Sequence, residues 1–166
     1  MRYEAPKTTK EAATFLKKEK GAAFILAGGT DLLVKMKLGL SEPDLVVDIK
    51  KIPAMNAISH SATGSKIGGA VSGAELGEHK GLCKTWPGVV EATNLIGSDQ
   101  IQSRATMVGN LCNASPAADS VPAMIAAGAK AIVVGSTKRR TVPIEKIVTG
   151  PGQTSLADDE VIEAIT

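Results

Sequence analysis

A short apolar run that meets two adjacent glycines constrains the fold of this chain more than any other feature. The run Phe24–Ala27 leads into Gly28 and Gly29, then into Thr30 and Asp31, after which apolar residues resume at helical spacing. This pattern predicts a strand that turns sharply into a helix. Both glycines let the backbone take φ > 0 and let a ligand approach the main chain closely. Free N–H groups in such a turn are typical of an anion site, although an ordinary tight turn has the same sequence.

A second glycine segment follows at residues 104–119, where Gly109 and Asn110 stand among small side chains. Two separate glycine turns indicate a bound phosphate ester, and a diphosphate fits them best. Asp48 lies near the position at which the acidic residue of a Rossmann domain binds a ribose hydroxyl. However, the third glycine of the Gly-x-Gly-x-x-Gly motif of that fold is missing. The sequence therefore predicts a diphosphate site in a fold other than Rossmann.

Helical and strand patterns alternate along the first half of the chain, which predicts an α/β fold. Capping boxes at Thr8–Glu11 and Ser72–Glu75 predict two helix starts. The strand expected at the C-terminal end of the sequence should have an unpaired edge and leave apolar surface exposed. Helices are expected over residues 9–20, 31–38, 73–79, 88–96 and 122–127, and strands over 22–27, 45–49, 57–58, 66–67, 130–134, 139–142 and 161–165.

Composition and rare residues exclude several classes of function. The net charge of +2 is too small to indicate nucleic acid or an anionic membrane, and no apolar run approaches the ~20 residues that span a bilayer. Cys83 and Cys112 cannot supply the four thiolates of an ordinary iron–sulfur cluster, so buried, reduced thiols of a cytoplasmic protein are expected. The basic cluster Lys138–Arg140 is expected at a solvated hairpin edge. His60 and His79 are expected at the solvated surface, so we assign no catalytic residue and no metal ligand.

The motifs, taken in order, resemble those of the FAD-binding subunit, or domain, of molybdenum hydroxylases, the xanthine dehydrogenase and aerobic carbon monoxide dehydrogenase group. That resemblance implies a PCMH-type fold, α/β or α+β, in which two small lobes grip an extended FAD. The lobes would be residues 1–55 and 56–166, and the family's C-terminal domain would be absent from this sequence. The residues that carry the resemblance are Ala27–Asp31, Pro43–Asp48, Ile96–Thr106, Gly109–Asn110, Ala114–Asp119 and Thr149–Thr154.

The resemblance also implies which residues bind FAD. Two loops, at residues 25–32 and 105–110, would hold the diphosphate, with the Thr30 hydroxyl as an added donor. Ile96 would lie beside the flavin, and Asn113 and Asp119 would hydrogen-bond the cofactor. Two alternatives stay open: Asp119 is as easily a helix N-cap or a turn residue, and Thr106 is as easily a strand residue. The full set is Ile25, Leu26, Ala27, Gly28, Gly29, Thr30, Asp31, Leu32, Ile96, Ala105, Thr106, Met107, Val108, Gly109, Asn110, Asn113, Asp119 and Ile162.

One position departs from the family pattern, because Val108 stands where the family usually has a glycine. A β-branched residue fits poorly where φ > 0 is needed, so we expect this loop to hold its ligand less closely.

The resemblance implies an electron-transfer function for the chain. Electrons would come from 2Fe–2S clusters on one partner chain, with molybdopterin on another, and pass through FAD on this chain to NAD or another acceptor. Two alternatives remain: a non-enzymatic scaffold subunit with weak or lost FAD binding, and a free-standing PCMH-type flavoprotein reductase.

Overall fold

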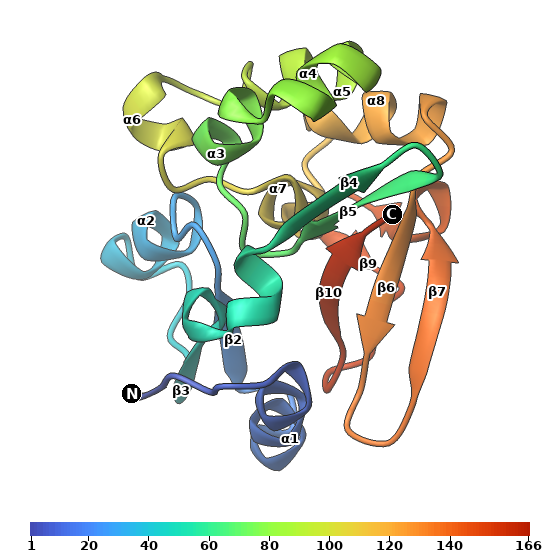
Figure 1. Cartoon of the computed structure of the whole chain (residues 1–166). Helices are drawn as coiled ribbons and strands as arrows, with labels where there is room; N and C mark the ends of the chain where they lie inside the picture. Colours follow the sequence, from blue (N-terminus) through green and yellow to red (C-terminus); the bar gives the residue numbers. More distant parts are fainter.

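A parallel three-stranded sheet forms the N-terminal part of the computed structural model, which describes all residues from 1 to 166 (Figure 1). Its strand order is β1-β3-β2, and both pairings are parallel. Parallel neighbours need a crossover connection, and two helices supply it. The elements are β1 (Arg2–Glu4), α1 (Thr9–Glu19), β2 (Ala23–Leu26), α2 (Leu32–Lys37) and β3 (Leu45–Asp48).

Helix α1 begins where the capping box predicts. The Thr8 hydroxyl accepts a hydrogen bond from the Glu11 N–H at 3.1 Å, while the Glu11 carboxylate accepts from the Lys7 N–H at 2.8 Å. The apolar face of α1 buries Ala12 and Leu16 in a cluster that also holds Leu45, Val47, Ile52 and Met55. Burial of this face, more than capping, holds so short a helix in place.

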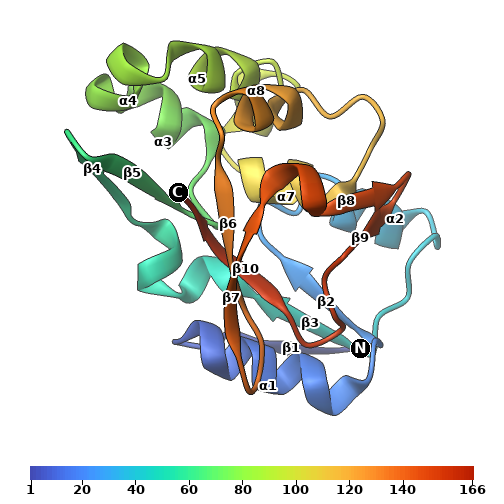
Figure 2. The same ribbon diagram turned by 90° about the vertical axis from the view of Figure 1, so that its right-hand side faces the viewer.

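A five-stranded antiparallel sheet forms the rest of the framework, in the order β4-β5-β10-β6-β7 (Figure 2). Its strands are β4 (Ile58–Ser61), β5 (Gly64–Gly68), β6 (Lys130–Val134), β7 (Arg139–Pro143) and β10 (Val161–Ile165). Helices α3, α4, α5 and α8 gather at one end of this sheet in both views (Figures 1 and 2). The helices of this region are α3 (Gly73–Glu78), α4 (Lys80–Thr85), α5 (Pro87–Thr93), α6 (Asp99–Gln102), α7 (Met107–Asn113) and α8 (Ser120–Ala126).

The C-terminal strand β10 lies at the centre of this sheet, so the prediction of an unpaired edge is wrong. Ile165 pairs with Ile67 of β5 on one side and with Ala131 of β6 on the other. All five residues of β10 are buried. Partners distant in sequence cover this strand, and no pattern within the strand itself reveals them.

Two apolar clusters form the core. The larger cluster joins the five-stranded sheet to the helices packed against it, and it includes Ile67, Leu111, Val133 and Ile162. The smaller cluster surrounds α1 and β3, but it also includes Ala70, which follows β5, and Val161, which begins β10. The division of the chain into lobes at residues 55 and 56 stays a prediction.

The hairpins and the five predicted helices are confirmed with small shifts of their ends, but other features differ from expectation. Helices α4 and α6 were not predicted. Strand β2 is half-buried rather than buried, because its side chains border a cavity. Residues 107–110, expected within a loop at 105–110, belong to α7. Strands β8 (Val148–Gly150) and β9 (Gln153–Thr154), together with β1, were not predicted. Short 3-10 turns complete the chain at Ile49–Lys51, Pro53–Asn56 and Ile144–Lys146.

Both histidines are half-buried, so the expected solvated position is wrong. The two rings meet edge to face, with their centroids 5.9 Å apart. The His79 Nδ1 accepts the Leu82 N–H at 3.2 Å and caps α4. The His60 Nδ1 lies 2.8 Å from the Ser65 hydroxyl across the β4–β5 hairpin. Both side chains therefore have a structural role, and neither is a freely solvated surface group.

Arginines of the basic cluster lie on the edge strand β7, as expected, but they are not simply solvated. Arg140 donates to both oxygens of Glu160, at 2.8 and 2.6 Å. The Arg140 guanidinium holds the pKa of the Glu160 carboxyl below its usual value. Glu160 is only 4% exposed, so this two-point pair compensates a carboxylate that would be costly to bury alone.

Both cysteines, Cys83 and Cys112, are free, but they are half-buried and not fully buried as expected. The length and hydropathy needed to cross a bilayer are found in none of the helices.

Candidate functional site

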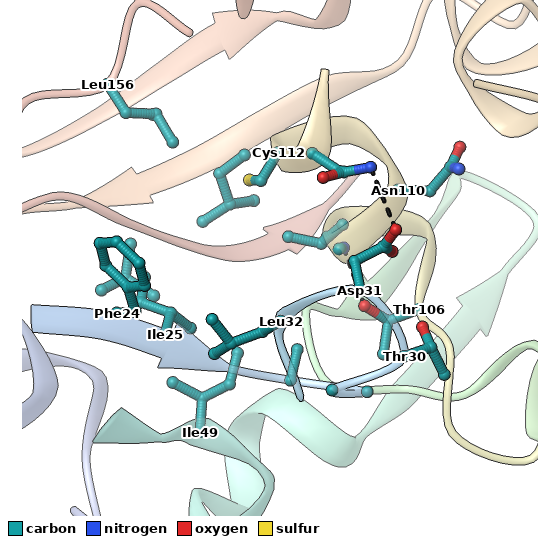
Figure 3. A pocket seen from close by; sticks show the side chains of 18 of the residues that line it. Phe24, Ile25, Thr30, Asp31, Leu32, Ile49, Thr106, Asn110, Cys112 and Leu156 are labelled. Atoms are coloured by element: carbon teal, nitrogen blue, oxygen red, sulfur yellow. Dashed lines mark hydrogen bonds between the residues drawn. The ribbon is translucent and has the colours of Figure 1, made fainter. Parts of the chain in front are cut away.

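A cavity of about 480 Å³ opens where the β2–α2 turn faces α7 and β10 (Figure 3). All of the predicted cofactor-binding residues line it except Leu26, Met107 and Asp119. The structure therefore brings together side chains from both glycine segments and from β10. The further lining residues, which sequence reasoning missed, are Leu16, Ala23, Phe24, Lys35, Ser41, Ile49, Cys112, Gly152, Leu156, Asp158, Glu160 and Val161.

The two glycine segments touch each other through their backbones. A Cβ on Gly28 would lie 2.5 Å from the Arg104 carbonyl oxygen and 2.8 Å from the Ala105 Cα. The Arg104 Nε donates to the Gly28 carbonyl oxygen at 3.3 Å. Only Gly29 has a left-handed backbone, with φ of 81°, so the expectation of φ > 0 at both glycines is corrected. Gly28 is needed for close approach and Gly29 for the turn.

The second segment enters helix α7 instead of forming a loop. Thr106 is the N-cap, and its hydroxyl accepts the Gly109 N–H at 2.8 Å. Thr106 is therefore not a strand residue. Val108 lies inside this helix without a positive φ, so the strain expected from its β-branch does not arise.

Main-chain N–H groups on both segments have no acceptor in the protein. The N–H groups of residues 28–32 and of Thr106, Met107 and Val108 donate to no carbonyl and to no side chain. The first N–H groups of any helix lack an intrahelical acceptor, and here the starts of α2 and α7, together with Gly28 and Gly29, border one cavity. Together they form a set of donors suited to an anion with several oxygens.

A polar bridge joins α2 to α7 across the cavity. The Asn113 Nδ2 donates to Asp31 Oδ1 at 3.3 Å, drawn dashed in Figure 3, and the Lys35 Nζ donates to Asn113 Oδ1 at 2.8 Å. Lys35 is the only Lys or Arg in the lining. Its position one helical turn after Asp31 was the sequence signal that could have identified it.

Apolar and polar side chains separate along the cavity. In Figure 3, Phe24, Ile25 and Leu156 lie toward one end, and Thr30 and Thr106 toward the other. An extended ligand with an aromatic part and a charged part would match this separation.

Carboxylates and one thiol complete the wall. Asp158 and Glu160 line the cavity with Asp31, and such oxygens can accept hydrogen bonds from ligand hydroxyls. Burial raises the pKa of the Cys112 thiol to about 12, so this thiol stays protonated and poorly nucleophilic at neutral pH.

Three predicted residues lie outside the lining. Met107 is buried in the larger core, and Leu26 packs beneath the turn, where its Cδ1 would meet a Cβ on Gly29. Asp119 is exposed, and it makes no side-chain cap to α8, so the alternative reading as a hydrogen-bonding N-cap is not realised. Asp48, considered and set aside as a ribose ligand, accepts the Tyr3 hydroxyl at 2.6 Å and does not line the cavity.

Comparison with known proteins gives consistent matches over most or all of the chain. The sequence profile of the family described as FAD binding domain in molybdopterin dehydrogenase matches residues 1–166. The carbon monoxide dehydrogenase medium chain of Hydrogenophaga pseudoflava is 32% identical over 98% of this chain, and the xanthine dehydrogenase FAD-binding subunit of Escherichia coli O157:H7 is 34% identical over 86%. The chain spans 57% and 49% of the length of these two relatives.

The fold has a close counterpart among solved structures. The carbon monoxide dehydrogenase from Hydrogenophaga pseudoflava that lacks the Mo-pyranopterin moiety aligns with 99% of this chain, with a TM-score of 0.95 and 32% identity. The match covers 57% of that protein's chain. The expected mixed α/β, non-Rossmann fold is therefore confirmed.

Proposed function

Because the chain belongs to the family of FAD-binding domains of molybdopterin dehydrogenases, we propose that its cavity holds FAD and that it serves as the electron-transfer component of a molybdenum hydroxylase. One observation carries the proposal. Two backbone segments in contact with each other have N–H groups without protein acceptors, and both line one cavity. A diphosphate supplies the oxygens that these donors lack.

The residues of the cavity fit the other parts of FAD. The hydroxyl of Thr30 and the amides of Asn110 and Asn113 supply side-chain donors, and Lys35 supplies positive charge. Carboxylates of Asp31, Asp158 and Glu160 can accept hydrogen bonds from ribose and ribityl hydroxyls. Ile96 and Ile162 belong to the apolar lining that can pack on aromatic rings.

When bound, the flavin supplies the one- and two-electron chemistry, and the protein positions it and excludes water. The polar bridge Asp31–Asn113–Lys35 fixes α2 against α7 beside the site. The Arg140–Glu160 pair orients one carboxylate of the wall. The high pKa of Cys112 supports non-covalent rather than thiol-linked binding of the flavin.

We propose the wider arrangement from the relatives. The 2Fe–2S clusters and molybdopterin would reside on partner chains, and electrons would leave through FAD to NAD or another acceptor. The proposed lobes, residues 1–55 and 56–166, would hold FAD between them. The two free thiols support a reducing, cytoplasmic setting.

The test is titration of the purified chain with FAD, followed by flavin fluorescence and absorbance. We expect saturable binding with one FAD per chain, and release of all flavin into solution on acid precipitation. A folded chain that shows no saturable binding, and is colourless once excess FAD is removed, would refute the cofactor assignment and favour the scaffold alternative. Flavin retained in the acid pellet would refute non-covalent binding.

A further inference from the structure

A second hollow, of about 450 Å³, lies between the start of α1 and the turn that joins β6 to β7. The helix and this turn lie side by side in both views (Figures 1 and 2). None of the residues that line it belongs to the lining of the cavity described above. Its apolar lining is confined to Ile52, Ala54 and Val134, so the hollow suits a polar ligand.

Positive charge dominates this hollow. Lys7, Lys10, Lys138 and Arg139 line it, and Glu163 is the only carboxylate among the lining residues. Two cations already compensate Glu163, because Arg139 lies 2.6 Å and Lys66 3.3 Å from its Oε1. The three lysines of the lining form no ion pair, so their charge is free to attract an anion.

Two neighbouring carboxylates are already engaged by main-chain N–H groups. Glu11, on the first turn of α1, accepts the Lys7 N–H at 2.8 Å. Asp159 accepts the Ser136 N–H at 3.1 Å beside the β6–β7 turn. Neither residue lines the hollow, so the net charge of its lining stays positive.

Thr9 supplies an unused donor within this charged surface. Its side chain lines the hollow with only 5% of the residue exposed, and its hydroxyl has no hydrogen-bond partner in the protein. No fully buried side-chain oxygen of the chain lacks a partner, so the Thr9 Oγ1 is accessible to solvent, and Thr9 is a residue of the hollow's lining. The N–H groups of Thr9 and Lys10, at the first turn of α1, also have no acceptor.

We propose that this hollow binds a phosphate group, either free or carried on a small polar molecule. A tetrahedral oxyanion can accept from the Thr9 hydroxyl and from the N–H groups of Thr9 and Lys10 together. The macrodipole of the eleven-residue helix α1 favours negative charge at that end. Lys10 and Lys138 approach from opposite walls, one from α1 and one from the β6–β7 turn. This site is independent of FAD and of the proposed electron transfer.

The test is a titration of the ¹⁵N-labelled full chain with inorganic phosphate, at ionic strength held constant with sodium chloride. We expect saturable amide shifts at Thr9 and Lys10. The variants Lys10→Gln and Lys138→Gln should each weaken the affinity about threefold, as expected for one exposed charge, while Lys84→Gln, an exposed lysine of α4 that lines neither cavity, should leave it unchanged. Thr9→Val, which removes only the hydroxyl at similar volume, should weaken binding further.

Two arms separate the sources of the phosphate. Tighter binding of glycerol 3-phosphate than of inorganic phosphate supports a phosphate carried on a small molecule, and equal or weaker binding supports free phosphate. The proposal is overturned if the Thr9 and Lys10 amides show no saturable shift, or if Lys10→Gln and Lys84→Gln bind phosphate equally well. Phosphate that shifts only amides 28–32 would also overturn it, because it would then occupy the first cavity alone.

Discussion

Replacing Lys35 with Met should weaken FAD binding about fivefold without unfolding the chain. Lys35 is the only Lys or Arg that lines the proposed FAD cavity, and its Nζ is held at 2.8 Å by Asn113 Oδ1. Because its side chain is exposed, a charged contact with a diphosphate falls in the range of surface pairs, about 0.2–1 kcal/mol. The hydrogen bond to Asn113 already orders the Lys35 side chain, so we take the upper end of this range, about 1 kcal/mol. A loss of that size raises the Kd for FAD about fivefold.

The assay is quenching of FAD fluorescence on titration with protein, at low and high salt. A charge effect should shrink as salt rises, because screening is stronger for exposed groups. Lys37→Met is the matched control, since Lys37 lies on the same helix and is exposed but does not line the cavity. Wild-type affinity of Lys35→Met at low salt, or an equal loss in Lys37→Met, would refute the reasoning.

Three further predictions concern the framework of the site. Gly28→Ala should destabilise the chain by about 1–3 kcal/mol and weaken FAD binding, because its Cβ would meet a carbonyl oxygen at 2.5 Å. Gly88→Ala, where a Cβ meets open space, should be tolerated, and chemical denaturation of both variants tests this. The lowered pKa of Glu160 contributes stability that is present above the unfolded pKa, near 4.5, and is lost as pH falls through the lower folded pKa. In thermal unfolding across acidic pH, the melting temperature of Glu160→Gln should therefore fall less steeply than that of the wild type, and equal slopes would contradict this role. Ser72→Ala should lower the free energy of unfolding by about 1 kcal/mol, because it removes the capping box of α3. The Ser98 side chain makes no cap hydrogen bond, so Ser98→Ala should change that free energy little, and equal unfolding midpoints would argue against the capping contribution.

Much of the fold follows from interactions within a few residues. The Thr8 and Ser72 caps lie within three residues of the N–H groups they bind, so sequence alone places α1 and α3. The β6–β7 hairpin likewise follows from two β-rich runs separated by a short polar turn. The same local logic predicts the turn between β2 and α2, and most of the predicted site residues do meet at one cavity.

Helix α7 shows where local patterns were insufficient. Gly109 and Asn110 are poor helix formers, and the N-cap Thr106 has no acidic residue at the third helical position. Burial of Met107, Val108 and Leu111 in the larger core stabilises this helix instead. A segment whose sequence resembled a glycine loop is therefore helical because of what packs against it.

Only the tertiary structure decides the remaining features. Strand β10 is central because β5 and β6, far away in sequence, pair with both of its edges. Gly28 is needed because the Arg104 carbonyl oxygen lies 2.5 Å from where a Cβ would be, and the Lys35 Nζ donates to Asn113 of α7, a residue distant in sequence. The sequence by itself determines elements whose stabilising contacts are local, together with the chemistry of the two glycine segments. The three-dimensional fold determines which distant residues meet, because long-range packing and pairing have no signature within either segment alone.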